Sequence, residues 1–399
     1  MPTAGRELPK KIIYLELLDS LLDADGGEGR VNYRLGRDFP WLYEEGWHME
    51  RWGLRRSKRI PYTGEPRSLR GPTFPLLAFP RVLLPAVVWA THFVQSMRRP
   101  RAGILVAYSP VTATGAAAAL LPRRRSSALV VRIISDFSAR SGALYGKRWE
   151  SRILERLERF VLRRSDLVLP MSPSTHQIAT RAGVGEERII DLPHPAPGFS
   201  PDVPAGAEES QAPRITAAGR LVPDKGFDLL IEAFATVSGA FPDATLEVAG
   251  DGPQRINLEA LARSLGVGDR VRFPGWLNRH EMPRFFGGAL VAVLPSRINE
   301  GLGMVLVEAG AAGCALIGTD VAGIRDIVHP DRTGFLVPPN DPRALAEALR
   351  ALLSDRALAK RLGEEARAEA RAYTDRSIEA VSRVHERIIA LRIAGGLAR

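Results

Sequence analysis

Two kinds of hydrophobic pattern alternate along this chain of 399 residues. Short, mostly apolar runs, which are typical of buried strands, are followed by segments in which apolar residues recur every three or four positions, which is typical of helices. In the second half this predicts strands at 215–218, 245–249, 271–273, 291–294 and 315–318, and helices at 227–237, 254–265, from 281, near 303–312 and at 343–353. Such alternation predicts an α/β fold with a parallel, doubly wound sheet.

The first half repeats the alternation. Strands are expected at 11–17, 103–108, 128–134 and 166–169, and helices from about 29 and at 113–121 and 148–164. The stretch 195–213 contains five prolines and two glycines and has no apolar periodicity, which is typical of a linker.

We therefore predict two Rossmann-like doubly wound domains facing each other across a cleft. The first covers residues 1–195, the linker 196–213 and the second domain 214–374, and a helix at about 375–399 is expected to pack back on the first domain. Ligands of such sheets bind outside the carboxyl ends of the strands, so we expect the site at the cleft.

Composition narrows the class of protein. Of the residues, 45% are hydrophobic and 25% charged, and no window holds the roughly 18 uninterrupted apolar residues that a spanning helix needs. The single cysteine, Cys314, excludes an internal disulfide and fits a reducing compartment. We expect a cytoplasmic protein, with peripheral association at the inner membrane face as an open alternative.

The excess of positive charge is confined to the first half. Residues 1–200 hold 31 Lys and Arg against 19 Asp and Glu, a net of +12, whereas residues 201–399 hold 24 against 26, a net of −2. The densest basic clusters are 55–59, 98–101 and 123–125. An anionic membrane surface or a phosphorylated acceptor would fit this asymmetry, and so would a solvated surface in an arginine-rich protein. Nucleic acid is not expected, because no recognition motif accompanies the charge.

The segment after the strand at 291–294 carries two acidic residues, Glu300 and Glu308. Glu300 stands just before a helix expected to begin near Gly303, and Glu308 lies within that helix. If the segment were helical throughout, the rise of 1.5 Å per residue would separate the two by about 12 Å, about the span from a sugar across a diphosphate to a ribose. The N–H groups at such a helix start bind anions, and here they belong to Gly301, Leu302, Gly303 and Met304. A helix cap and an exposed helix charge would explain either glutamate alone, but they explain poorly why Glu308 sits in an apolar run.

A second cluster follows the strand at 215–218. Arg220 and Lys225 flank a turn that leads into a helix, and Lys225 is one of only six lysines, against 49 arginines. An Arg fork and a compact Lys charge together suit a diphosphate. Two surface cations near a helix start are the less favoured interpretation, because a helix N-terminus repels cations.

These segments resemble glycosyltransferase family 4, whose members are retaining enzymes of GT-B fold. The resemblance runs from about residue 214 to 373 and rests on four motifs in order: Gly219-Arg220…Lys225-Gly226, Ala249-Gly250-Asp251-Gly252-Pro253, Phe273-Pro274-Gly275 and Glu300-x7-Glu308.

The resemblance implies a role for each matched residue. Glu300 would contact the hydroxyls of the donor sugar, and Glu308 those of the ribose. Arg220 and Lys225 would neutralise the diphosphate, and the base would lie near Gly275 and Trp276.

Over the first half the resemblance is thinner. Gly26 and Gly27 match a glycine pair of the family that approaches the diphosphate and the acceptor. The family often has a histidine after the strand equivalent to 128–134, over the transferred sugar, but this chain has Ser135 and Asp136 there. His194, between two prolines, is expected to be a loop residue and not a catalyst.

The resemblance implies transfer of a hexose from a nucleoside diphosphate sugar to a hydroxyl of a glycan, lipid-linked or small-molecule acceptor, with retention at the anomeric carbon. We expect no cofactor and no metal requirement, because Arg220, Lys225 and the helix start would neutralise the leaving diphosphate. The sequence leaves open a nucleotide-sugar-binding protein without turnover and a GT-B epimerase. A phosphorylase would need a lysine for pyridoxal phosphate, and the small number of lysines argues against it. A dehydrogenase is not expected, because no Gly-x-Gly-x-x-Gly follows a strand.

Overall fold

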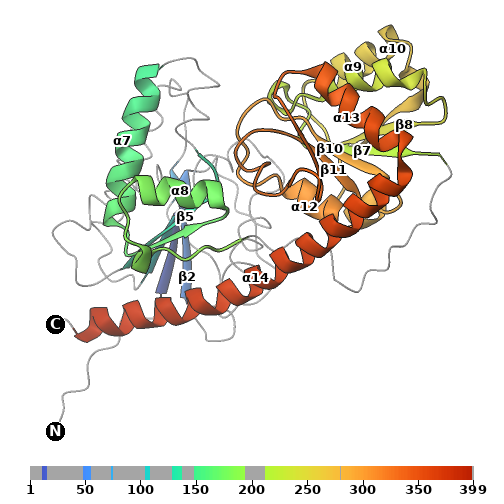
Figure 1. Ribbon diagram of the computed structural model, residues 1–399. Helices are drawn as coiled ribbons and strands as arrows, with labels where there is room; N and C mark the ends of the chain where they lie inside the picture. Colours follow the sequence, from blue (N-terminus) through green and yellow to red (C-terminus); the bar gives the residue numbers. More distant parts are fainter. Residues whose placement is uncertain are drawn as a thin grey trace. The chain divides into compact units, whose positions relative to one another are not determined.

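The chain forms two compact units, 1–194 with 377–399, and 195–376. The computed structural model describes residues 11–15, 48–54, 73–74, 104–107, 128–136, 148–193, 212–278 and 280–397 (Figure 1). Several predicted features lie outside these residues: Gly26 and Gly27, His194, the basic clusters 55–59, 98–101 and 123–125, the helices from 29 and at 113–121, and the linker up to 211.

The first unit contains a six-stranded parallel sheet in the order β3-β2-β1-β4-β5-β6. Its strands are β1 (Lys11–Leu15), β2 (His48–Leu54), β3 (Thr73–Phe74), β4 (Ile104–Ala107), β5 (Ala128–Ile133) and β6 (Leu167–Pro170). The helices described within residues 1–194 are α7 (Arg148–Arg164), α8 (Pro173–Arg181) and the 3-10 turn η1 (Glu186–Arg188). β5 and β6 are buried along their whole length, as expected of strands covered on both faces.

The second unit has the same topology. Its strands are β7 (Arg214–Ala218), β8 (Thr245–Ala249), β9 (Val271–Gly275), β10 (Val291–Leu294), β11 (Ala315–Thr319) and β12 (Gly334–Val337), and they pair in parallel in the order β12-β11-β10-β7-β8-β9. If the strands of each unit are numbered along the chain, both sheets have the order 3-2-1-4-5-6. The first and fourth strands, here β7 and β10, are therefore the two central ones. Consecutive connections leave these two strands for opposite faces, which makes the crevice between them the expected ligand position.

Helices cover both faces of this second sheet. They are α9 (Phe227–Ser238), α10 (Arg255–Ser264), α11 (Met282–Phe286), α12 (Met304–Ala311) and α13 (Pro342–Ser354), with 3-10 turns η2 (Pro223–Lys225) and η3 (Gly268–Arg270). Figure 1 shows α9, α10 and α13 on one face and α12 on the other. α9 buries Phe227, Leu230, Ile231, Phe234 and Val237, a spacing that places them on one side of the helix.

The last helix, α14 (Arg356–Leu397), is longer than the sequence indicated. The prediction began it at about 375, whereas buried residues recur at helical spacing from Ala359 through Leu362, Ala366 and Ala370. Its residues up to Arg376 belong to the second unit and those from Ser377 to the first. Within the first unit, Ser377 Oγ donates to the carbonyl of Pro193 at 2.8 Å, and Arg387 donates to the carbonyl of Glu187 at 3.2 Å.

Some elements have no counterpart in the prediction. The hydrophobic pattern does not indicate β2, β3, β12 or α8, because each is short or lacks a clear apolar period. α8, for example, buries only Thr175 and Ala179. Its start is instead stabilised by a capping box in which Ser172 Oγ accepts from the N–H of Thr175, and Thr175 Oγ1 accepts from the N–H of Ser172.

Candidate functional site

Two loops meet at the carboxyl ends of the central strands β7 and β10. The loop after β7 runs through η2 and places Lys225 just before α9, and the loop after β10 carries Glu300. Gly226 joins η2 to α9 with φ of 67°, and a Cβ at this position would clash with the carbonyl oxygen of Pro295. Only glycine permits both this backbone conformation and so close an approach of the two loops.

Lys225 and Glu300 form an ion pair across this junction. Lys225 Nζ lies 2.6 Å from Glu300 Oε1, and the two side chains are only 14% and 12% exposed. Ser296, which is fully buried, donates from Oγ to the same carboxylate oxygen. The cation predicted for a diphosphate and the carboxylate predicted for a sugar are therefore in direct contact.

A second ion pair joins the same loops. Arg297 Nη1 and Nη2 each lie 2.7 Å from a carboxylate oxygen of Asp228, in the first turn of α9. Burial alone would raise the pKa of Asp228, but the hydrogen bonds and charge of Arg297 hold it below its ordinary value. The hydrogen bond with Asp228 likewise raises the pKa of Arg297.

On its other side the β10 loop is attached to the loop after β11. The N–H of Glu300 donates to the carbonyl of Ala322 at 2.9 Å, and Asn299 Oδ1 accepts from the N–H of Ala322 at 3.2 Å. Thr319 Oγ1, at the end of β11, donates to the carbonyl of Ser296 at 2.6 Å. Glu300 is thus held in a loop that is anchored to both neighbouring loops.

The separation of about 12 Å between Glu300 and Glu308 was estimated for a segment that is helical throughout, but the helix begins only after Glu300. α12 begins at Met304, and its N-cap, Gly303, has φ of 66° and makes no side-chain capping bond. Residues 300–303 are not helical, so the carboxylates are not on one continuous helix. Glu308 is the fifth residue of α12 and is half-buried, and the buried Leu302 precedes the cap. The N–H groups at this helix start remain suited to an anion.

The remaining predicted donor residues of the second unit also lie at the carboxyl ends of its strands. Gly219 donates to the carbonyl of Ala249 at 3.0 Å, and Gly250 to that of Gly275 at 2.7 Å, so the loops after β7, β8 and β9 are in backbone contact. Arg220 is exposed in the first of these loops. Trp276 is 64% exposed, next to Gly275, whose φ is 86°. A large aromatic side chain held so far in solvent is available to a ligand.

In the first unit, Ser135 and Asp136 follow β5 and are half-buried. Asp136 lines a cavity of about 170 Å³ with Glu155, Glu158, Arg159, Ile178, Arg181 and Ala182. Five of these seven residues carry a charged side chain.

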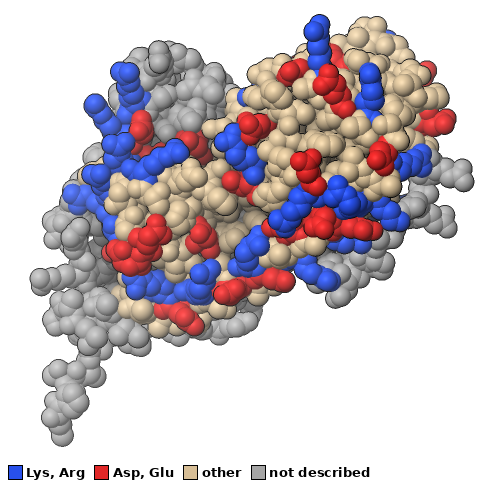
Figure 2. All heavy atoms as spheres, viewed as in Figure 1, with Lys and Arg blue, Asp and Glu red and all other residues tan. Residues whose placement is uncertain are grey.

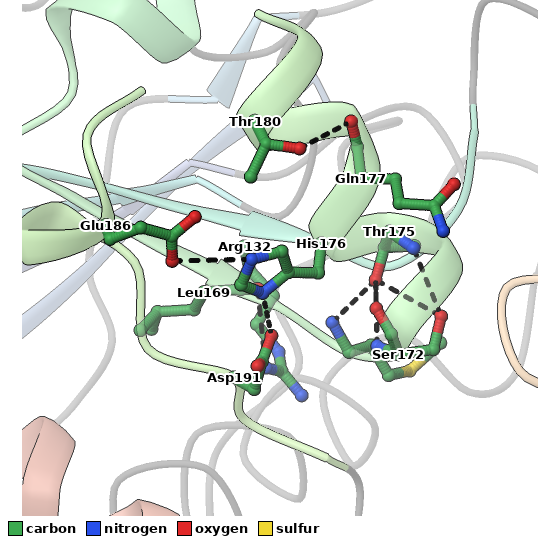
Figure 3. Close-up of polar contacts among 10 residues, drawn as sticks. Arg132, Leu169, Ser172, Thr175, His176, Gln177, Thr180, Glu186 and Asp191 are labelled. Carbon is green, nitrogen blue, oxygen red and sulfur yellow. Dashed lines mark hydrogen bonds and ion pairs between the residues drawn. The ribbon is translucent and has the colours of Figure 1, made fainter. Parts of the chain in front are cut away.

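His176, on α8 of the same unit, contacts two carboxylates (Figure 3). Its Nδ1 lies 2.8 Å from Asp191 and its Nε2 3.5 Å from Glu186. Burial alone would lower the pKa of His176, but the hydrogen bonds and charges of the two carboxylates raise it above its ordinary value. Asp191 follows a segment that runs beside the edge strand β6. His176 therefore lies beside the edge strand β6, and not directly after β5, where the resemblance would place a histidine.

Two kinds of feature are absent from the part of the chain that the structure describes. It contains no group of three or more His, Cys, Asp or Glu side chains placed to hold a metal ion. None of the described helices combines the length and apolarity needed to cross a bilayer. Acidic and basic side chains are interspersed along the visible face of α14 (Figure 2).

The sequence does not single out Ser296, Arg297 or Asp228. In the sequence, Asp228 is only an acidic residue at a helix start, and Arg297 is one arginine among many. Their contact joins positions 69 residues apart, and no local pattern indicates it.

Two doubly wound sheets, one with a largely buried Lys–Glu pair beside a helix start at its switch point, define an α/β protein with two Rossmann-like domains. Comparison with known proteins specifies it. Residues 202–369 match the model of glycosyl transferases group 1, and residues 26–194 match that of the glycosyl transferase 4-like domain. The chain belongs to the family-4-like glycosyltransferases of GT-B fold.

Individual proteins agree with this assignment. A GDP-mannose-dependent alpha-(1-6)-phosphatidylinositol monomannoside mannosyltransferase of Mycobacterium tuberculosis is 34% identical over 181 residues, which make up 42% of this chain and 47% of that protein. In the first curated relatives the matching segments make up only 21% to 56% of the relative's length.

Solved structures agree on the fold over most of the chain. Sucrose-phosphate synthase from Thermosynechococcus elongatus has a TM-score of 0.73 at 22% identity, covering 95% of this chain and 99% of that one. HepE of Anabaena in complex with UDP has a TM-score of 0.68 at 18% identity, covering 95% and 100%.

Proposed function

We propose that this chain is a retaining glycosyltransferase that moves a hexose from a nucleoside diphosphate sugar to a hydroxyl of a glycan, lipid-linked or small-molecule acceptor. The observation that carries the proposal is the Lys225–Glu300 pair at the carboxyl ends of β7 and β10, beside the start of α12. A relative that uses GDP-mannose and a structural neighbour that holds UDP support a nucleotide-linked donor.

In this proposal the donor lies across the carboxyl ends of the strands of the second sheet. Arg220, Lys225 and the N–H groups of residues 301–304 bind the diphosphate, and Glu308 the ribose. The base lies against Gly275 and Trp276, and Glu300 holds the hydroxyls of the transferred sugar. From the family resemblance we also assign Gly26 and Gly27 to the diphosphate and Ser135 and Asp136 to the acceptor.

Donor binding changes the electrostatics of the buried pair. Without donor, Lys225 is neutralised by Glu300 at 2.6 Å. A diphosphate within reach of Nζ gives the lysine a second anionic partner, while Glu300 gains sugar hydroxyls that donate to it. The pair therefore serves as a preformed link between the two ends of the donor.

The chemical step exchanges one bond at the anomeric carbon for another. The bond from this carbon to the phosphate oxygen breaks, and its electrons remain on the diphosphate, where the cations and the helix start stabilise them. The acceptor oxygen forms the new bond on the same face, and its proton passes to the departing phosphate oxygen. We propose that these groups make a metal ion unnecessary.

The first test is donor binding by thermal shift with UDP, GDP, UDP-glucose and GDP-mannose. A ligand at 100 times its dissociation constant adds about 2.7 kcal/mol to the free energy of unfolding, so nucleotides of one base should raise the Tm clearly above those of the other. Retention is then tested by NMR, since an α-linked donor should yield an α-linked product. No shift with any of the four compounds at millimolar concentration would contradict the proposal.

The second candidate is a nucleotide-sugar-binding protein with little turnover, favoured by Ser135 and Asp136 in place of the family's histidine. Hydrolysis of the bound sugar nucleotide, measured with and without cell lipid extract, separates the two. Binding without release of sugar under either condition would favour this candidate.

We further propose that the protein is cytoplasmic and reaches its acceptor at an anionic membrane surface through the N-terminal domain.

A further inference from the structure

The loop that carries Glu300 is long, irregular and tethered at two points. Toward β11 it is attached to Ala322, by the backbone N–H of Glu300 and by the side-chain Oδ1 of Asn299. Toward β7 it is attached by Arg297. Lys225 is placed differently, because η2 connects it directly to the start of α9. The geometry of the Lys225–Glu300 pair therefore depends on how firmly the β10 loop is held against α9.

Arg297 makes four contacts with this neighbouring segment. Its guanidinium meets both carboxylate oxygens of Asp228 at 2.7 Å, and Nη1 also donates to the carbonyl of Pro223 at 2.9 Å. Its backbone N–H donates to the carbonyl of Asp224 at 2.8 Å. A bidentate Arg–carboxylate pair fixes both distance and orientation. The contacts therefore attach the β10 loop three residues before Glu300.

We propose that Arg297 is a positioning residue for sugar transfer, which holds Glu300 against Lys225 through its bidentate pair with Asp228. The inference rests on the proposed function of the Lys225–Glu300 pair. Arg297 and Asp228 side chains are 26% and 41% exposed, so their contact is accessible to water. Its importance comes from the geometry that it imposes and not from a large contribution to folding.

The expected effect is larger on the chemical step than on binding. Without the fork the β10 loop is held toward β7 only by the backbone bond from residue 297 to Asp224 and by the Lys225–Glu300 pair itself, so Glu300 shifts relative to the sugar. Lys225 keeps its place, because η2 and α9 hold it independently. Misplacement of a catalytic group by about 1 Å can lower the rate about 100-fold.

The experiment compares Arg297→Met, Arg297→Lys and Arg270→Met in the full chain. Arg270 is a matched control, because its guanidinium also donates to carbonyls, those of Ser238, Phe241 and Pro242. It lies at the amino end of β9, whereas the Lys225–Glu300 pair lies at the carboxyl ends of β7 and β10. For each variant we would measure the Tm, the Kd of UDP and GDP by calorimetry, and kcat for hydrolysis of UDP-glucose and GDP-mannose.

We expect Arg297→Met to lower kcat about 10- to 100-fold, with the nucleotide Kd changed less than about threefold. Arg297→Lys should restore part of the loss, because it keeps the charge without the fork. Arg270→Met should lower the Tm and leave kcat unchanged. If Arg297→Met has the kcat of the wild type and still binds nucleotide, the role of Arg297 is overturned, but the proposed function is not. If the wild-type chain binds neither UDP nor GDP, the proposed function itself fails.

Discussion

Lys225 and Glu300 depend on each other in a way that changes how single substitutions should be interpreted. Both side chains are largely buried and share one short contact. Removing one therefore affects the other's electrostatics as well as its own ligand contact.

Glu300→Gln should lower transfer about 100- to 1,000-fold, as removal of a preorganised polar group in an active site commonly does. Nucleoside diphosphate affinity should stay within about threefold of wild type, because the amide keeps an oxygen toward Lys225 and the nucleotide is bound by other groups. Calorimetry with UDP and GDP alongside kcat provides the measurement, and Glu347→Gln, an exposed position on α13, is the control. Equal losses of affinity and kcat would show that Glu300 belongs to the nucleotide site.

Lys225→Ala and Arg220→Ala should each weaken nucleoside diphosphate binding by about 1.5–3 kcal/mol, the usual contribution of a charge-assisted hydrogen bond. Lys225→Ala should cost more in Tm than Arg220→Ala, since it leaves the largely buried Glu300 without its cation, whereas Arg220 is exposed. Titration of UDP and GDP into each variant measures the first effect, and thermal unfolding the second. Undiminished affinity in either variant would remove that residue from the diphosphate site.

Among the elements, α9 shows how backbone conformation positions a site residue. Its first turn holds Asp228, and Gly226 precedes it in a left-handed conformation against Pro295. The opposite end of the same helix is Gly239, which has φ of −68° and where an added Cβ would have no neighbouring atom within 4 Å. The two glycines offer a matched pair on one helix.

Gly226→Ala should destabilise the second unit by more than about 2 kcal/mol, because a left-handed residue with a Cβ costs roughly 1–2 kcal/mol and the contact with Pro295 adds to it. Gly239→Ala should be neutral or stabilising by up to about 1 kcal/mol, since alanine restricts the unfolded chain. Urea unfolding of both variants measures the difference. A Gly226→Ala variant as stable as wild type would mean that the two loops approach each other less closely.

α8 should show a pH-dependent stability contribution from His176. The pKa of His176 is raised in the folded chain by Asp191 and Glu186 against the effect of burial. The contribution is therefore fully present below the ordinary histidine pKa of about 6.5 and is lost as the pH rises through the folded value. The Tm difference between wild type and His176→Ala should be larger at pH 6 than at pH 9. An equal difference at both values would indicate that packing, and not charge, accounts for the effect.

For the whole molecule, the unequal distribution of charge is the feature that donor binding does not explain. The first 200 residues carry a net +12 and the remainder −2. Among the described helices of the first unit, α7 exposes Arg152, Arg156, Arg159 and Arg163. The basic clusters 55–59, 98–101 and 123–125 add to this charge in sequence, although they lie outside the described residues.

The chain should sediment with vesicles that contain anionic lipid at low salt and be released at high salt. Each cation near an anionic leaflet contributes about 1 kcal/mol, and the attraction is screened over about 8–10 Å at physiological salt. Vesicles of neutral lipid are the control. Failure to bind at low salt, or equal binding to neutral vesicles, would rule out the membrane and favour a soluble acceptor.

Features that depend on neighbouring residues could be predicted from the sequence. Alternation of buried strands and one-sided helices identified most elements of the second unit, and α7 and β10 have the predicted bounds, because burial leaves a periodic pattern in the local sequence. The motifs around Lys225 and Glu300 identified the family for the same reason, since each motif is continuous in the chain.

Which of these segments meet follows from the folded structure alone. The strand order brings β7 beside β10, and with them Lys225 to Glu300 and Asp228 to Arg297, although the members of these pairs are 75 and 69 residues apart in sequence. Likewise, the division of α14 between the two units follows from what its buried residues pack against and not from any break in its helical pattern. Periodicity records that a side chain is buried, but the partner that covers it is specified by the packing of the whole chain.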